Sequence, residues 1–197
     1  MEEWKPEVVV FSEVDQTWSA QLSRIQNLLP YSKVFPREDN FGIAIYSKYP
    51  ITSAQLVSLG GTPAIDAELL FDQRKTRVIA VHLLPPMSEA GLLRRNQGVD
   101  ELVALVKSSN IPTIVVGDLN MTAYSSKFKD LLENTDLNDS GKGFGLLPTW
   151  NADHPFFFRI TIDHCFFSNE LILLDRNRGK KIGSDHYPIF VDFTWRS

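Results

Sequence analysis

The chain has 197 residues, a length that fits one domain with a buried core, and we expect a single domain over residues 1–197. Its formal net charge is −4 and its basic residues are scattered, which argues against a broad electrostatic surface for duplex nucleic acid. The single cysteine, Cys165, excludes an intramolecular disulfide and a thiolate metal cluster. No stretch approaches the ~18 apolar residues of a membrane span and the N-terminus is unlike a signal peptide, so the sequence predicts a soluble chain.

Apolar runs with β-branched residues or period-two alternation predict strands along most of the chain. These runs are Glu7 to Phe11, Phe41 to Ser47, Ile51 to Leu59, Ala64 to Phe71, Thr76 to His82, Thr113 to Val116, Ile160 to Phe167 and Pro188 to Trp195. Helical spacing recurs between Trp18 and Leu29 and between Val99 and Val106, and a shorter helix is expected at Ser125 to Glu133. Successive strands in the middle and helices elsewhere predict an α/β sandwich of two mixed, mostly antiparallel sheets flanked by helices.

Several predicted strands end in polar residues that an ordinary core does not need. Glu13 follows the first strand, His82 ends the fifth, and Asp118 and Asn120 follow the sixth. A strand end lies at the rim of a sheet, where a rigid element can hold carboxylates near one another for a metal. In isolation Glu13 indicates a surface residue, His82 a core histidine, and the Asp118 turn a helix cap.

Two further segments place acids beside histidines. Asp185 and His186 are adjacent just before the last strand, where a carboxylate can hold a divalent ion and an imidazole can contact phosphate or exchange a proton. Asp163 lies inside an apolar strand, which is costly unless the carboxylate has a partner. A histidine would be the natural partner, and the alternative is an aspartate at an exposed strand edge.

Loops and aromatic residues offer candidate substrate contacts. The candidate loops are Tyr31 to Asn40, Leu84 to Leu92 and Ser140 to Pro155. The densest basic stretch comprises Arg176, Arg178, Lys180 and Lys181, for which a solvated loop is the simpler interpretation. The aromatic cluster of Trp150, Phe156, Phe157 and Phe158 could stack a base or touch a lipid, although packing in a core is the commoner use of such residues.

Six motifs taken together resemble the endonuclease/exonuclease/phosphatase superfamily in their order and spacing. They are Pro6-Glu7-Val8-Val9-Val10-Phe11-Ser12-Glu13, Gly42-Ile43-Ala44-Ile45-Tyr46-Ser47, Val81-His82-Leu83, Gly117-Asp118-Leu119-Asn120, Ile162-Asp163-His164 and Gly183-Ser184-Asp185-His186. The resemblance covers nearly the whole chain. It implies a four-layer α/β sandwich that hydrolyses phosphoesters with one Mg²⁺ or Mn²⁺.

On this resemblance, Glu13 would be the principal metal carboxylate, and Asp185 would help to hold the metal or the water. Asp118 would position or deprotonate the nucleophilic water, while Asn120 would contact the scissile phosphate. Such a site, with one or two carboxylates and retained waters, suits Mg²⁺.

The histidines take the remaining roles that the resemblance implies. His186 would contact the phosphate and share in acid and base work, Asp163 would orient it, and His82 would lie near the leaving group. The family normally opens with a strand that carries an asparagine beside the metal, and no such strand precedes Glu13 here. We therefore expect an N-terminally incomplete domain without the first strand; an upstream segment could carry a signal or membrane anchor, and the compartment stays open.

The resulting hypothesis is a divalent-metal-dependent phosphoester hydrolase, similar to a phosphodiesterase or nuclease, that uses metal-assisted in-line attack by water. One alternative is a lipid- or inositol-phosphate phosphatase of the same fold, and another is an inactive binding fragment. The expected partner is a phosphoester substrate, either a nucleic acid or a phospholipid headgroup, and the chain is expected to be a monomer.

Overall fold

The structure is a computed structural model that describes residues 4–71 and 73–196. Its largest described sheet runs in the order β4 (Ile51–Leu59), β5 (Thr62–Phe71), β6 (Arg74–His82), β7 (Thr113–Asp118), β9 (Asp163–Ser168) and β8 (Leu137–Asp139). A smaller sheet has the order β1 (Val8–Ser12), β3 (Ile43–Ser47) and β2 (Tyr31–Phe35), and β10 (Leu171–Arg178) pairs with β11 (Ile189–Trp195). The helices are α1 (Gln16–Leu22), α2 (Glu89–Lys107) and α3 (Ser126–Glu133), with 3-10 turns η1 (Ser23–Asn27) and η2 (Phe156–Phe158).

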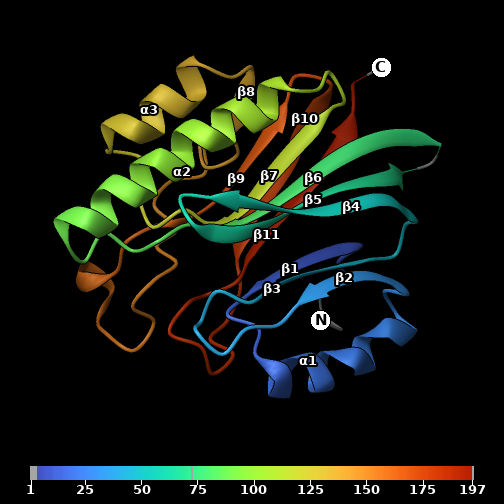
Figure 1. Ribbon diagram of the computed structural model, residues 1–197, viewed down its shortest axis with the longest axis horizontal. Coiled ribbons are helices and arrows are strands. Elements are labelled where there is room, and N and C mark those ends of the chain that lie inside the picture. The colour runs from blue at the N-terminus through green and yellow to red at the C-terminus, as the bar shows by residue number, and fades with distance from the viewer. Residues whose placement is uncertain (1–3, 72, 197) are drawn as a thin grey trace.

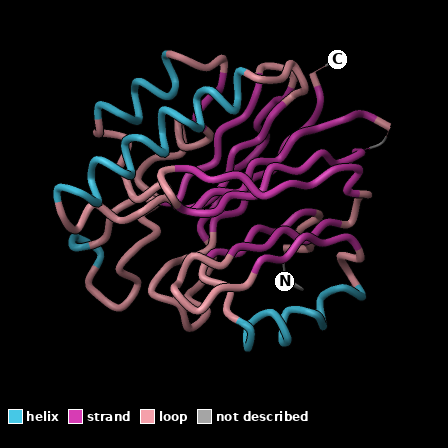
Figure 2. The backbone as a smooth tube through the Cα atoms, in the orientation of Figure 1, coloured by secondary structure: helices cyan, strands magenta, loops and turns pink. Residues whose placement is uncertain are grey.

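These elements stack in four layers, as Figure 1 shows. Helices α2 and α3 cover one face of the six-stranded sheet, the three-stranded sheet covers the other, and α1 lies outside the three-stranded sheet (Figures 1 and 2). A separate apolar core fills each interface between neighbouring layers. The predicted four-layer α/β sandwich is therefore confirmed.

Strand β6 explains why the middle of the sandwich is so apolar. Its side chains alternate between two buried faces, with Val78 and Ala80 directed toward the three-stranded sheet and Ile79 and Val81 toward the helices. A strand that is covered on both sides needs apolar residues at every position, not only at every second one. The run from Val78 to Val81 therefore marks a central strand.

Helix α2 forms the crossover between β6 and β7, which pair in parallel. Its N-terminus is capped by Ser88, whose side chain accepts a hydrogen bond from the amide of Gly91. The crossover brings the ends of β6 and β7 to the same edge of the sheet. None of the described helices is long and apolar enough to cross a membrane.

Three strands were not predicted, namely β2, β8 and β10. Part of the expected loop at Tyr31 to Asn40 is thus a strand. Arg176, expected in a solvated loop, lies in β10 and is buried, where its guanidinium hydrogen-bonds to Ser140 and to the carbonyl of Asp163. One residue of this basic stretch therefore has a structural role, because it connects β10 to Ser140 and to the first residue of β9.

Candidate active site

The register of the six-stranded sheet aligns three of the predicted site residues. The parallel pairing of β6 with β7 sets His82 opposite Asp118, and the antiparallel pairing of β7 with β9 sets Asp118 opposite Asp163. These residues form one row at the edge where β6 and β7 end and β9 begins. Glu13 follows the end of β1 in the facing sheet, and its electrostatic interaction with Asp118 shows that it reaches this row.

Gly117 allows β7 to come close to β6 directly beside the row. Its φ of 142° is a conformation that side chains rarely adopt, and an added Cβ would lie 2.0 Å from the carbonyl oxygen of Val81. Only glycine fits this approach. The glycine that precedes Asp118 in the sequence therefore has a steric cause as well as a turn-forming one.

Two of the predicted site residues have left-handed backbone conformations. The φ angles are 58° at Glu13 and 49° at Asn120, and such strain persists only where neighbours enforce it. The amide of Asn120 donates to Oδ1 of Asp118 at 2.7 Å, and its side-chain Nδ2 donates to the carbonyl of Leu83 at 2.8 Å. The buried Arg95 of α2 donates to the Asn120 carbonyl at 3.1 Å, so the turn is held from three sides.

His186 is bound to Asp163, as the cost of a carboxylate in an apolar strand predicted. Nδ1 of the imidazolium donates to Oδ2 of Asp163 at 2.8 Å. Burial opposes the charged form of His186, but this hydrogen bond and the charges of Asp163, Asp118 and Asp185 outweigh it and raise the pKa of His186 to about 9. His186 is therefore a cation at neutral pH.

Asp118 lies between the two histidines. Its Oδ2 is 3.8 Å from Nε2 of His82 and 4.0 Å from Nε2 of His186. Burial raises the pKa of Asp118 well above its ordinary value, and the negative charges of Asp163 and Glu13 raise it further. This carboxylate is thus more basic than an exposed aspartate and can accept a proton near neutral pH.

His82 is a neutral member of the row. Burial, together with the positive charge of His186, lowers the pKa of His82 to about 4. Its ring lies 5.1 Å from the ring of Phe41, and within the described residues its Nδ1 has no hydrogen-bond partner. A buried imidazole nitrogen without a partner is unusual in a core and indicates a group that a ligand or water completes.

Glu13 and Asp185 are the two exposed carboxylates at the mouth of the cluster. Partial desolvation raises the pKa of Glu13, and the charges of Asp185 and Asp163 add to this effect. Oδ2 of Asp185 accepts a hydrogen bond from Nε1 of Trp150 at 3.2 Å, which fixes the carboxylate. Four carboxylates therefore converge with His186 as their neighbouring cation.

This donor set fits a hard divalent cation. Ligand atoms of Asp118, Asp163 and His186 lie within 4.8 Å of one another, and Glu13 interacts electrostatically with all three. Because Asp163 and His186 already bind each other, the exposed oxygens of Glu13 and Asp185 are the freer ligands. Crowded carboxylates with raised pKa values gain most from a bound divalent cation.

All seven predicted residues thus lie at one end of the sandwich, and two supporting residues were missed as site residues. Thr149 is fully buried, and its Oγ1 accepts from the amides of Ile162 and Asp163 at 3.2 Å each. Arg95 sits four residues before the buried Val99 on α2. A cation on the buried face of a helix was the signal that could have identified it.

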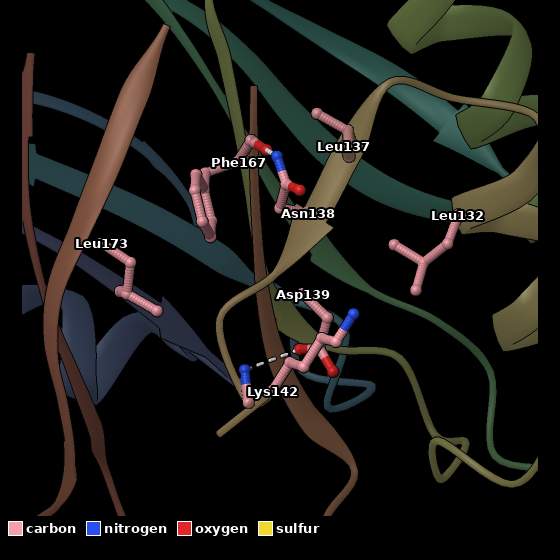
Figure 3. A pocket seen from close by; sticks show the side chains of 8 residues that line it. Leu132, Leu137, Asn138, Asp139, Lys142, Phe167 and Leu173 are labelled. Carbon is pink, nitrogen blue, oxygen red and sulfur yellow. Dashed lines mark hydrogen bonds between the residues drawn. The ribbon is translucent and has the colours of Figure 1, made fainter. Parts of the chain in front are cut away.

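A separate hollow of about 500 Å³ lies away from this cluster, between β8 and β10 (Figure 3). Its lining includes the apolar side chains of Leu137, Phe167 and Leu173, together with Asp139 and Lys142. None of the seven predicted residues lines it. The hollow is therefore distinct from the candidate active site.

The comparisons with known proteins agree with this fold. The model of the Endonuclease/Exonuclease/phosphatase family matches residues 1–186. No curated protein matches the chain. Because the solved structures below are less than 25% identical to the chain, they support the fold alone.

Three solved structures share the fold. An endonuclease/exonuclease/phosphatase from Beutenbergia cavernae has 18% identity and a TM-score of 0.79 over 98% of this chain, which spans 64% of that protein. D. rerio TDP2 complexed with single strand DNA product has 15% identity and a TM-score of 0.82, with 98% and 88% of the two chains covered. The mannosyl-6-phosphatase Bt3783 of Bacteroides thetaiotaomicron has 19% identity and a TM-score of 0.72, with 98% and 87% covered. The match of the family model over residues 1–186 shows that this chain belongs to the endonuclease/exonuclease/phosphatase family.

Proposed function

We propose that the chain is a divalent-metal-dependent phosphoester hydrolase that activates water for in-line attack on phosphorus. The observation that carries this proposal is the row of His82, Asp118 and Asp163 across the sheet edge, with His186 bound to Asp163. A buried base, a fixed cation and exposed carboxylates then surround one point. This combination matches what phosphoester hydrolysis requires.

Asp118 is the base in this proposal. Its raised pKa suits the removal of a proton from water at neutral pH, and the Asn120 amide keeps Oδ1 fixed while Oδ2 stays free to act. The water oxygen bonds to phosphorus and its proton passes to Asp118, while the bond from phosphorus to the leaving oxygen breaks. The leaving oxygen keeps the electron pair of that bond and takes up a proton from solvent water. Arg95 and Leu83 hold the turn that presents these groups.

His186 acts as a fixed cation for the phosphate. Its Nδ1 proton is committed to Asp163, so Nε2–H is available to a phosphate oxygen. The negative charge that grows on the phosphate oxygens in the transition state is stabilised by this donor. His82 is neutral, and its proposed place is near the leaving oxygen.

Glu13 and Asp185 would hold the Mg²⁺ or Mn²⁺, with Trp150 fixing Asp185. When bound, the metal would supply electrostatic stabilisation of the phosphate oxygens. The protein residues described above orient the phosphate and move the proton.

The substrate is proposed at the level of a phosphoester. One fold relative is complexed with a single strand DNA product and another is a mannosyl-6-phosphatase, so the two act on chemically different phosphate compounds. What they share is a phosphate group, which is also what the row of Asp118 and His186 can recognise. Loops around the row would then select the rest of the substrate.

Isothermal titration calorimetry with Mg²⁺ and Mn²⁺ tests the metal site. The wild-type chain should give a saturable heat that Glu13→Gln removes or weakens by about tenfold or more. Glu7→Gln is the matched control, because Glu7 pairs with Lys48 on the surface and should leave the heat unchanged. Equal binding heats for wild type and Glu13→Gln would refute this metal site. If wild type gives no saturable binding heat with either metal, the result would favour an inactive binding fragment.

A further inference from the structure

Three consecutive phenylalanines project into solvent near the candidate active site. Phe156, Phe157 and Phe158 form η2, and the side chain of Phe157 is 78% exposed. Core packing, the commoner use of such residues, is therefore wrong for all three. Exposed clusters of large apolar side chains are rare on soluble surfaces and mark interaction sites.

The segment that carries these phenylalanines is hydrogen-bonded to the loop of Asp185 and His186. Trp150 forms antiparallel bridges with both Ile160, which follows the phenylalanines, and His186, so it connects the two segments. The amide of Ala152 donates to the carbonyl of Asp185 at 2.8 Å. Whatever η2 contacts will therefore be held at a fixed position relative to the catalytic residues.

Positive charge accompanies the exposed aromatics. With the buried Arg176 left out, segments 141–160 and 177–184 together contain five Lys and Arg and a single acidic residue, Asp153, whereas the whole chain has a net charge of −4. An ion pair between Lys181 and Asp153 brings the two segments together. The loops around the site are thus basic on an acidic protein, and they suit an anionic surface.

Other loops at the same end also expose apolar side chains. Met87 follows β6 and Tyr124 follows β7, the two strands that end at the catalytic row. Leu146 and Ile182 are exposed on the two basic segments. Apolar tips therefore come from four loops around one active site.

We propose that this end of the molecule docks on an anionic phospholipid bilayer, with Phe156, Phe157 and Phe158 inserted at the headgroup level. This inference rests on the proposed function, because it names the surface from which the phosphoester reaches the site. Aromatic and aliphatic tips gain by leaving water at the membrane interface, while Lys and Arg are attracted to anionic headgroups. Neither contribution requires a membrane-spanning helix.

The aromatic geometry favours lipid over single-stranded nucleic acid. The rings of Phe157 and Phe158 pack against each other with centroids 4.7 Å apart and planes tilted by 52°. Base stacking uses a flat ring face that is open to the base, whereas these rings are tilted onto each other. The exposed side chains of Met87, Leu146 and Ile182 have no aromatic ring on which a base could stack, but they fit a lipid interface.

Vesicle co-sedimentation tests the proposal with vesicles of phosphatidylcholine, with and without phosphatidylglycerol. The wild-type chain should bind the anionic vesicles more tightly, and added salt should weaken that binding because the Lys and Arg contribution is screened. Phe157→Asp should lower the partition coefficient by about tenfold or more, the change expected from losing one inserted ring. Leu28→Asp is the matched control and should bind as wild type does. Leu28 is 64% exposed and lies just before Tyr31, which pairs with Ser47 at the end of the three-stranded sheet away from Glu13.

Two further measurements separate this proposal from the proposed function. Asp118→Ala, which should lack turnover, should keep the vesicle binding, so binding and catalysis can fail independently. Thermal unfolding of Phe157→Asp should match wild type, which shows that the variant is folded. Absence of binding to anionic vesicles, or equal binding by Phe157→Asp and wild type, would overturn the docking surface. Loss of oligothymidylate binding in Phe157→Asp with vesicle binding unchanged would assign the phenylalanines to nucleic acid instead.

Discussion

Nδ1 of His186 lies 2.8 Å from Oδ2 of Asp163, and this hydrogen bond joins the loop before β11 to the first residue of β9. The contact does more than position a ring. It places the main counter-charge of His186 on a strand of the central sheet, so the protonated state of the imidazole depends mainly on Asp163, with smaller contributions from Asp118 and Asp185. Changes at Asp163 should therefore appear in the titration of His186.

Asp163→Asn should lower the pKa of His186 in the metal-free chain. The wild-type imidazole should titrate at about 9, and the variant should titrate closer to the ordinary histidine value of about 6.5, because the charged hydrogen-bond acceptor is lost. Histidine NMR across the pH range measures both values. An unchanged midpoint in the variant would show that Asp163 does not hold the His186 charge.

The same shift predicts a pH dependence of stability. A group with a raised pKa in the folded state stabilises the fold fully below its unfolded pKa, about 6.5, and this contribution is lost as the pH rises through about 9. The stability advantage of wild type over Asp163→Asn should therefore shrink by up to about 3 kcal/mol between neutral and alkaline pH. Urea unfolding at several pH values measures this difference.

Arg77→Met should be strongly destabilising because it leaves a buried carboxylate unpaired. Arg77 donates to Asp66 at 2.7 and 2.9 Å and to the Leu105 carbonyl at 2.8 Å, and both charged side chains are buried. The expected loss at neutral pH is about 3–5 kcal/mol in urea unfolding. Lys75→Met removes a surface ion pair with Glu68 and should cost at most about 1 kcal/mol.

Acid should reduce the difference between Arg77→Met and wild type. Burial raises the pKa of Asp66, but hydrogen bonds from Arg77 and Gln55 outweigh this effect, so the net pKa is lowered. A lowered pKa means that the stabilisation is present above the unfolded pKa of about 4 and is lost as the pH falls through the folded value. A difference that stays constant into acid would show that Arg77 does not hold the Asp66 charge.

Gly117→Ala should destabilise the fold far more than the same substitution at another glycine with a positive φ. The added Cβ would meet the Val81 carbonyl oxygen at 2.0 Å, so β6 and β7 must separate, at a cost of about 3 kcal/mol or more. Gly143→Ala is the matched control, since Gly143 also has a positive φ but nothing lies within 4 Å of the new Cβ. Its cost should be only about 1 kcal/mol. Similar losses for the two variants would contradict the close strand approach.

Trp150→Phe should weaken metal binding although an aromatic ring remains at this position. It removes the Nε1 donor that holds Asp185 at 3.2 Å, and loss of a residue that orients a metal ligand typically costs about tenfold in affinity. Calorimetry with Mn²⁺ measures the effect. Trp18→Phe, at an exposed tryptophan of α1, should leave the affinity unchanged. If both variants bind Mn²⁺ as wild type does, Trp150 has no such positioning role.

The strongly apolar strands were predictable from the sequence, but the strands with mixed patterns were not. Strand β6 is apolar on both faces and was predicted at nearly its full length. Strand β10 has the sequence Leu171-Ile172-Leu173-Leu174-Asp175-Arg176-Asn177-Arg178, which shows no clean alternation of apolar and polar residues. Its register with β11 also shifts between Leu173 and Asp175. Strand β8 has only three residues. Tertiary pairing, rather than local pattern, specifies these elements.

The candidate site residues could be selected individually from the sequence, but their arrangement could not. Strand ends and polar residues in apolar runs identified His82, Asp118 and Asp163, yet their alignment depends on the pairing of β6, β7 and β9 across long sequence separations. Pairing over such distances is not encoded in local periodicity. Exposure of Phe157 was likewise invisible, because an apolar run has the same composition in a core and on a surface.

The most direct test of the hydrolase proposal is turnover of chromogenic phosphodiesters and phosphomonoesters by the purified chain with Mn²⁺, Mg²⁺ or a chelator. Turnover should require the metal, and Asp118→Ala and His186→Ala should each reduce it by about 100-fold or more. The first substitution removes the proposed base, and the second removes the proposed hydrogen-bond donor to the phosphate. Leu28→Asp should retain full activity. Turnover that persists with chelator, or that survives both substitutions, would contradict the proposed mechanism.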